Sequence, residues 1–162
     1  MPPDRAPRAP NAGAGLAVAD DSTSDVERNG QVVVLRVGAD NYAVGVEAVR
    51  EVILSPGVTP LPGSASIVLG VCNVRGDIVP IIDTSALLGL GAGPTPSHVV
   101  IVRVPDGEAG LSTTTVPSFT LLGDRVGDVD VPGQVGAYRV ADGIATLLDL
   151  DSLVKRERLD GA

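Results

Sequence analysis

The 162-residue sequence has few aromatic residues, one histidine and one cysteine. These shortages exclude an aromatic core, a multi-histidine metal site and an internal disulfide. The only aromatic residues are Tyr42, Phe119 and Tyr138, so the core must consist of aliphatic side chains. One histidine, His98, cannot form a multi-histidine metal site. One cysteine, Cys72, cannot form an internal disulfide, which agrees with a reducing compartment and predicts a cytoplasmic protein. Because Cys72 lies in an apolar run, we expect a buried, unreactive thiol.

Basic residues and long apolar runs are also scarce. The chain has 12 basic and 20 acidic residues, a net charge of −8, which repels nucleic acid and anionic lipid. No run approaches the roughly 18 apolar residues of a membrane span, and prolines interrupt the N-terminal segment where a signal peptide would be apolar. We therefore expect neither nucleic-acid binding nor direct membrane insertion.

The abundant residues divide the chain into a tail and a folded part. Residues 1–30 are mainly Ala, Pro, Gly, Asp and Ser, and such a segment buries too little apolar surface to fold, which predicts a disordered tail. From Gln31 onward, the Val-rich and Gly-rich composition favours short strands and tight turns over long helices.

One pattern occurs twice in the folded part. Residues 32–37 resemble 99–104, residues 42–52 resemble 119–129, and residues 70–83 resemble 136–149. The offsets are 67, 77 and 66 residues, so the second copy is predicted to have an expanded loop at Pro105–Ser118 and a shortened connection before Gly136.

Each copy is predicted to fold as a hairpin, an irregular crossing, a second hairpin and a short helix. Asp83 or Thr84 can cap a helix over residues 86–88, and Asp149 or Asp151 can cap one that runs to about Arg158. Five strands with unpaired edges favour closure into a barrel. We therefore expect a mainly β protein with two barrels sharing one apolar core, the first at about 31–90, the second at about 98–158, and a Gly/Pro linker at 91–97.

One sequence motif suggests catalysis. Residues 81–86 resemble the Asp-Thr-Gly signature of aspartic proteases, and the repeat makes Asp149 a possible second carboxylate for Asp83. However, Ser85 and Asp151 stand where that signature has glycine, and an aspartate that begins a short helix is an ordinary N-cap. The phosphate-binding glycine motifs are missing, and so are the remaining ligands of a calcium loop around Asp149. We predict no catalytic residue, no cofactor and no metal.

Two charged residues remain to be explained. Glu51 and Arg75 are each flanked by apolar residues, and the sequence alone is equally consistent with solvent-facing strand ends.

The motifs together resemble those of the CheW-like coupling proteins of bacterial chemotaxis. Residues 70–83, Gly-Val-Cys-Asn-Val-Arg-Gly-Asp-Ile-Val-Pro-Ile-Ile-Asp, are similar to that family's Asn-Leu-Arg-Gly signature. Residues 42–52 and Leu61-Pro62 lie where the family has their counterparts, and the second copy matches at 121–126 and 136–153. The chain departs from the family in the loop expected at Pro105–Ser118 and in the short segment at 130–135.

This resemblance implies two intertwined five-stranded barrels of the Src-homology-3 type and a scaffold that couples chemoreceptors to the histidine kinase CheA. It also implies that Arg75 pairs with Glu51, and that an apolar groove between the barrels, around Val49 and with Gly70 nearby, takes the receptor tip. The regulatory domain of the kinase would bind the ends of both barrels. A module of the same kind in another chemosensory pathway, such as pilus motility or development, is the alternative.

Overall fold

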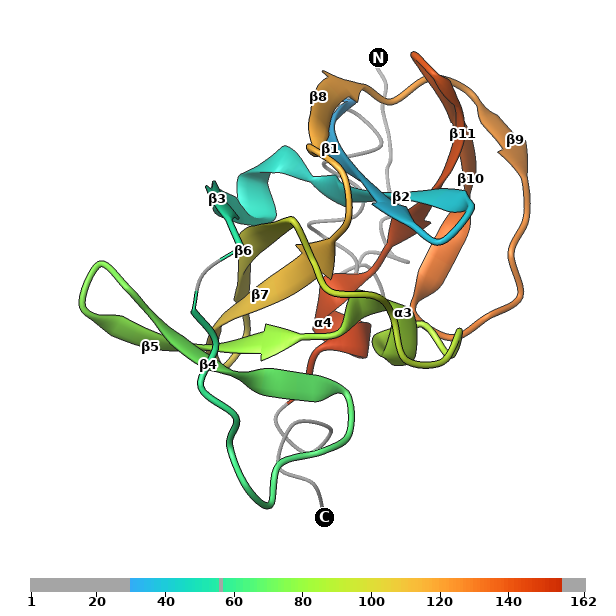
Figure 1. Ribbon diagram of the computed structural model, residues 1–162. Helices are drawn as coiled ribbons and strands as arrows, with labels where there is room; N and C mark the ends of the chain where they lie inside the picture. Colours follow the sequence, from blue (N-terminus) through green and yellow to red (C-terminus); the bar gives the residue numbers. More distant parts are fainter. Residues whose placement is uncertain (1–29, 56, 156–162) are drawn as a thin grey trace, which may run out of the picture.

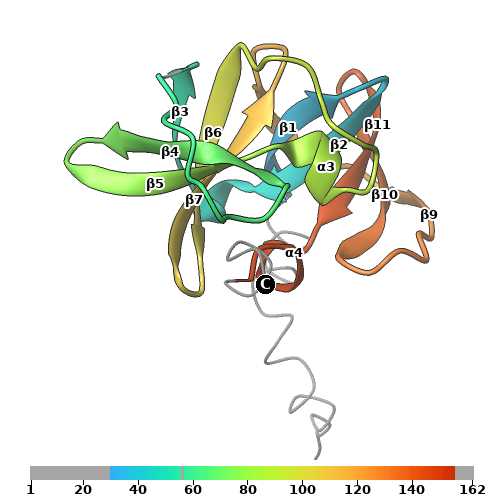
Figure 2. The same ribbon diagram turned by 60° about the horizontal axis from the view of Figure 1, so that its bottom comes forward.

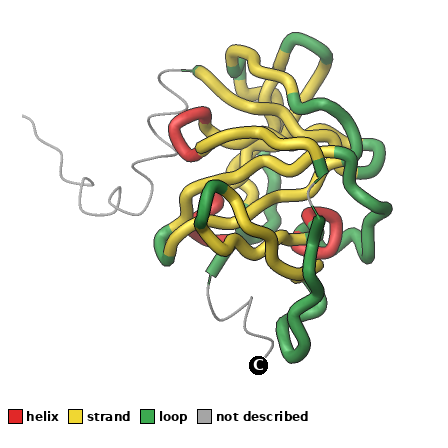
Figure 3. Tube along the Cα trace, turned by 60° about the vertical axis from the view of Figure 1, so that its left-hand side comes forward, coloured by secondary structure: helices red, strands yellow, loops and turns green. Residues whose placement is uncertain are grey.

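The computed structural model describes residues 30–55 and 57–155, which form eleven strands, two short α-helices and one 3₁₀ turn (Figure 1). The predicted disordered tail lies outside these residues, apart from Gly30. Strands make up most of the trace, as Figure 3 shows. The elements are β1 (Gln31–Val37), β2 (Asp40–Gly45), η3 (Val46–Ala48), β3 (Val49–Leu54), β4 (Val68–Val74), β5 (Asp77–Ile82), α3 (Thr84–Leu87), β6 (His98–Val104), β7 (Gly107–Thr113), β8 (Ser118–Leu121), β9 (Arg125–Gly127), β10 (Gln134–Val140), β11 (Gly143–Leu148) and α4 (Leu150–Leu153).

The strands form two sheets that exchange segments. One sheet has the order β8-β1-β2-β11-β10-β9 and the other has the order β3-β6-β7-β5-β4. The first hairpin of each copy thus pairs with the later strands of the other copy, through parallel contacts between β2 and β11 and between β5 and β7. The predicted mainly β, intertwined fold is confirmed. The halves 31–90 and 98–158 do not correspond to the two sheets, however, and β9 makes one sheet six-stranded.

Aliphatic side chains fill three clusters. Val32 and Val34 of β1 pack with Tyr138, Val140 and other residues of the six-stranded sheet, which therefore curls over its own interior. A similar cluster around Cys72 fills the five-stranded sheet. The alternate residues of β1, including Leu35, face a third and larger cluster that both sheets share. Figure 2 shows the two sheets side by side, with α3 and α4 where they meet.

The pairing registers show where the repeat lies. Val37 pairs with Asp40 in the first copy, as Val104 does with Gly107 in the second, at the 67-residue offset. The 67-residue offset also holds for the next strand of each copy, β3 and β8. Val52 of β3 pairs with β6 at the position equivalent to the one where Phe119 of β8 pairs with β1. Phe119 is therefore the counterpart of Val52, and the predicted match between residues 42–52 and 119–129 is wrong. In both sequences an aromatic residue lies within a strand, Tyr42 in β2 and Phe119 in β8, which explains the misalignment.

The predicted loop at Pro105–Ser118 is wrong for the same reason. It contains β7, which follows β6 after a two-residue turn at Pro105 and Asp106. The connection before β10 is shorter by only one residue, since the 12 residues 122–133 correspond to the 13 residues 55–67 of the first copy. The second copy therefore keeps all the strands of the first.

The short helices follow the second hairpins, as predicted, but α4 is shorter than expected. Asp83 caps α3, and its carboxylate accepts a hydrogen bond from Ala86 N at 3.3 Å and one from Gly93 N at 2.9 Å. Helix α4 ends at Leu153, so the prediction that it runs to about Arg158 is wrong over Val154 and Lys155; residue 158 lies outside the described part of the chain.

Candidate functional site: an ion-pair network beside an apolar groove

Glu51 and Arg75 form an ion pair at one end of the five-stranded sheet. Arg75 Nε donates to Glu51 Oε1 at 3.0 Å and lies 3.3 Å from Oε2, so one nitrogen contacts both carboxylate oxygens. The Arg75 side chain is 73% exposed, whereas that of Glu51 is only 20% exposed. The predicted pair is confirmed as a contact, and the arginine side presents charge to solvent.

The turn between β4 and β5 positions Arg75. Val74 pairs with Asp77, so Arg75 and Gly76 are the two central residues, and both have positive φ angles, 52° and 92°. Two such residues define the turn type that matches the twist of a tight hairpin. The side chain of Asn73 completes the turn by accepting a hydrogen bond from Gly76 N at 2.9 Å. Asn73, Arg75 and Gly76 of the signature therefore shape the hairpin tip that holds the arginine.

Arg50 extends the pair into a network that the sequence analysis missed. Its Nη1 lies 2.6 Å from Glu108 Oε1 and 3.3 Å from Asp77 Oδ2, and its Nε lies 3.6 Å from Glu51 Oε1. Neighbouring strand residues normally point to opposite faces, but the pairing of β3 with β6 shifts register between Val49 and Glu51. This bulge explains how Arg50 and Glu51 reach one another. The network joins β3, β7 and the β4–β5 hairpin.

The network changes how Glu51 titrates. The hydrogen bond from Arg75 is the largest cause that lowers the pKa of Glu51 below its ordinary value, and the charges of Arg75 and Arg50 add to it, against a smaller opposing effect of burial. Glu51 in turn raises the pKa of Arg75. Both shifts favour the charged forms, so Glu51 and Arg75 are both charged at neutral pH.

An apolar groove begins at the same network. Its cavity of about 360 Å³ is bordered by Glu108, the partner of Arg50, and by strands β4 and β5. Ile78 and Leu61 on its wall are 67% and 49% exposed, so both present apolar surface to solvent. The lining residues are Leu61, Val68, Val71, Ile78, Pro80, Val104, Asp106, Gly107, Glu108 and Val154.

Val49 and Gly70 are not among the residues that line this groove. Val49 is half-buried and packs against the shared core, as does the groove residue Val104, but Val49 does not line the groove itself. Gly70 is buried with a φ of 152°, and a Cβ there would lie 2.7 Å from the carbonyl carbon of Thr59 and from Val58 Cγ1. The backbone of Thr59 pairs with Val71, so Gly70 lets this loop approach β4 closely.

The alternative site residues have ordinary structural roles. Asp83 caps α3 as described above, whereas Asp149 accepts a hydrogen bond from Ser152 Oγ at 2.7 Å. No hydrogen bond joins these two carboxylates in the described structure. Cys72 is buried, and burial raises the pKa of its thiol, as predicted. Residues 30–55 and 57–155 contain no group of three or more His, Cys, Asp or Glu side chains placed to hold a metal ion.

An open apolar groove bordered by charged side chains is typical of a protein-interaction module. The comparison with protein families identifies which one: the model of the CheW-like domain matches residues 31–158. The chain belongs to the CheW-like domain family.

Known relatives agree with this assignment. The chain is 32% identical over 142 residues to a chemotaxis protein CheW of Rhizobium meliloti (strain 1021), covering 82% of this chain and 92% of the relative. It is 37% identical over 78 residues to the protein PilI of Pseudomonas aeruginosa, or 47% of this chain and 44% of that one. The crystal structure of the scaffolding protein TtCheW from Thermoanaerobacter tengcongensis superposes with a TM-score of 0.69 at 22% identity, covering 80% of this chain and 90% of that one. Within the described residues, no helix is long and apolar enough to cross a membrane.

Proposed function

We propose that this protein is a non-catalytic adaptor that couples the cytoplasmic tips of chemoreceptors to a CheA-type histidine kinase. Family membership and relatives named chemotaxis proteins support this role. The protein would act in the cytoplasm and reach the receptor array through its partners.

The observation that carries the proposal is the apolar groove beside the Glu51–Arg75 pair. A helical receptor tip can place an apolar stripe against Ile78 and Leu61, both of which are largely exposed. The charges of Arg75 and Asp77 at the rim would orient the helix and speed its encounter more than they would strengthen binding. Val49 and Gly70 would act indirectly, since Val49 supports the core under the groove and Gly70 holds the adjoining loop.

The kinase would bind the ends of the two sheets. The chain was expected to depart from the family in the second copy, at the loop 105–118 and before Gly136. The second copy nevertheless has the full set of strands, so both sheet ends remain available to the kinase.

A role in another chemosensory pathway is the second candidate. The similarity to PilI, which does not carry a chemotaxis name, favours it over 78 residues only. The same adaptor mechanism would apply, with a different receptor and kinase.

The decisive experiment mixes the full chain with a receptor signalling fragment and a kinase regulatory domain from the same genome and follows co-elution and titration. We expect Ile78→Asp to weaken receptor binding by at least about tenfold, because it places a charge in the apolar groove. Ile144→Asp is the matched control, since Ile144 is 52% exposed at the equivalent position of the other hairpin. Val49→Asp tests whether Val49 contributes to receptor binding. Thermal unfolding of this variant is measured as well, because Val49 packs against the core.

Ternary co-elution supports the coupling role. If Ile78→Asp and Ile144→Asp have equal effects on receptor binding, the groove is not the receptor site. If neither partner binds at high micromolar concentration, the coupling proposal is wrong for this chain.

A further inference from the structure

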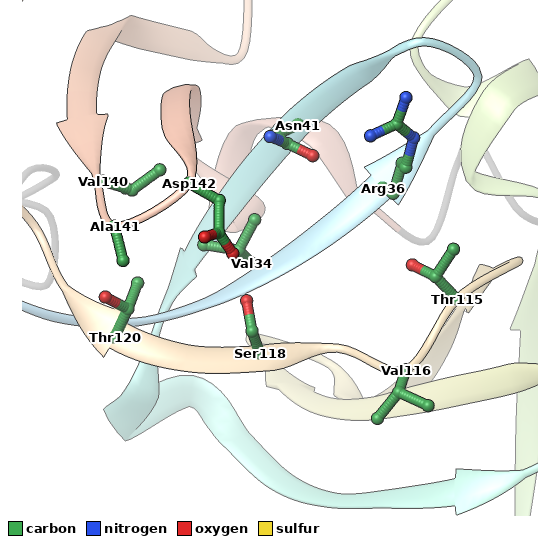
Figure 4. A pocket seen from close by; sticks show the side chains of 10 residues that line it. All are labelled: Val34, Arg36, Asn41, Thr115, Val116, Ser118, Thr120, Val140, Ala141 and Asp142. Carbon is green, nitrogen blue, oxygen red and sulfur yellow. The ribbon is translucent and has the colours of Figure 1, made fainter.

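A second groove lies at the end of the six-stranded sheet, and it is polar. Its cavity has a volume of about 290 Å³. Figure 4 shows that the residues lining it lie over β1, between β8 and the turn from β10 to β11. Val34 and Val140 form an apolar floor, and hydroxyl, amide and charged groups surround it. The lining residues are Val34, Arg36, Asn41, Thr115, Val116, Ser118, Thr120, Val140, Ala141 and Asp142.

This groove is the counterpart, in the other sheet, of the ion-pair site. Ser118 pairs with Val34 on β1, as Glu51 pairs with Ile101 on β6, so Ser118 stands where the first copy has Glu51. By the registers of the second hairpins, Ala141 stands where the first copy has Arg75. Asn41 likewise takes the place of Glu108. The ion pairs that cover one sheet end therefore have no equivalent at the other.

Two opposite charges at this end remain without partners. Within the described residues, the side chains of Arg36 and Asp142 form no ion pair or hydrogen bond, and both are exposed. The counterpart of Arg36, Arg103, donates instead to the carbonyl oxygen of Glu47 at 3.2 Å. Arg36 is thus free to hold a carboxylate, and Asp142 is free to accept from a cationic group.

The placement of these charges favours an extended ligand. In Figure 4, Asp142 points from its turn toward Ser118, and Arg36 lies farther along the groove, beyond Asn41. Arg36 is two residues beyond Val34 on β1, a rise of about 7 Å, whereas a single carbon separates the charged groups of a free amino acid. The cavity is near the lower limit of about 300 Å³ for small-ligand pockets.

We propose that this groove binds a short zwitterionic peptide, of two or three residues, with its carboxylate on Arg36 and its ammonium group on Asp142. Ser118, Thr120 and Asn41 supply hydrogen bonds to the peptide amides, and the floor accepts small apolar side chains. The site goes beyond the proposed coupling function, and it lies at one of the two sheet ends where the kinase is proposed to bind.

The test is a titration of the ¹⁵N-labelled full chain with tri-L-alanine, followed by NMR. We expect saturable shifts at β8, Asn41 and the 141–142 turn, with a dissociation constant of about 1 mM or below. Acetylating or amidating the peptide should weaken binding about tenfold each, because each removes one charge contact. Free L-alanine should bind far more weakly than the tripeptide.

Variants distinguish specific binding in this groove from nonspecific binding to the protein surface. Arg36→Gln and Asp142→Asn, both at exposed positions, should each weaken binding about tenfold, whereas Arg103→Gln in the other sheet should leave it unchanged. Ser118→Glu combined with Ala141→Arg copies the Glu51–Arg75 pair and should abolish binding in a protein that still unfolds cooperatively. The proposal is overturned if tri-L-alanine gives no saturable shift up to about 10 mM. Equal binding of the peptide capped at both ends, equal binding of L-alanine, or unchanged affinity in Arg36→Gln and Asp142→Asn would also overturn it.

Discussion

Glu51 carries the clearest electrostatic signature among the single residues, because Arg75 and Arg50 both stabilise its charged form. Arg75→Ala should therefore raise the pKa of Glu51 toward the ordinary glutamate value of about 4.3. Carboxyl-detected NMR titration of both proteins measures the change. Arg125→Ala, which removes an exposed ion pair with Asp128 elsewhere, is the control and should leave the titration of Glu51 unchanged.

The same shift fixes the direction of a pH effect. The folded-state pKa of Glu51 is below its unfolded value, so the stabilisation it provides is present above the unfolded pKa and is lost as pH falls through the folded pKa. Because Arg75 is mostly exposed, thermal unfolding at neutral pH should change little in Arg75→Ala. A large loss of thermal stability would mean that the pair is structural.

Gly70 is the residue where a single methyl group should matter most. Gly70→Ala places a Cβ against Val58 and Thr59 at an unfavourable φ, and we expect it to lower the free energy of unfolding by at least about 1 kcal/mol. Gly57→Ala is the matched control, in the loop that packs against Gly70, since a Cβ at Gly57 would meet nothing within 4 Å. Urea unfolding measures both, and equal effects would contradict the close approach.

At the scale of elements, the two short helices have different caps. Asp83→Ala removes the hydrogen bonds to Ala86 N and Gly93 N, and should cost about 1–2 kcal/mol of unfolding free energy. Asp149→Ala should cost less, because within the described residues its carboxylate accepts from the Ser152 hydroxyl and from no backbone N–H of the helix. Chemical denaturation of both variants provides the measurement. The opposite order of stability would show that capping does not explain these aspartates.

The elements that sequence predicted are those with local signals. The second hairpin of the first copy and the cap at Asp83 depend on residues a few positions apart, and both are confirmed. The Glu51–Arg75 contact came from the family resemblance. Arg50 was missed because its reach depends on a bulge, and β7 was missed because Gly-Glu-Ala-Gly-Leu-Ser-Thr has little strand propensity and is held by its neighbours β6 and β5.

For the whole molecule, the exchange of strands makes the two halves depend on each other. Each sheet takes its first hairpin from one copy and its remaining strands from the other. Residues 1–90 alone should therefore be unfolded by circular dichroism, as should residues 91–162, and mixing the two should restore the spectrum of the full chain. A well-dispersed NMR spectrum from either fragment alone would contradict this dependence.

The exchange itself could not be read from residue patterns. Alternating valines predict strands and their buried faces, but the same alternation fits pairing with either copy. Only the parallel contacts of β2 with β11 and of β5 with β7, far apart in sequence, decide between them.

Strand exchange also has a mechanical consequence. The turn at Arg75-Gly76 belongs to a sheet that includes β6 and β7, and the turn at 141–142 belongs to one that includes β1 and β2. Each half of the chain is hydrogen-bonded into both sheets. A force applied to one turn is therefore transmitted to the other through hydrogen-bonded backbone and not through a flexible linker. We expect the two sheets to move as one rigid body. A small displacement of a protein bound at one turn would then displace a protein bound at the other turn by a similar amount.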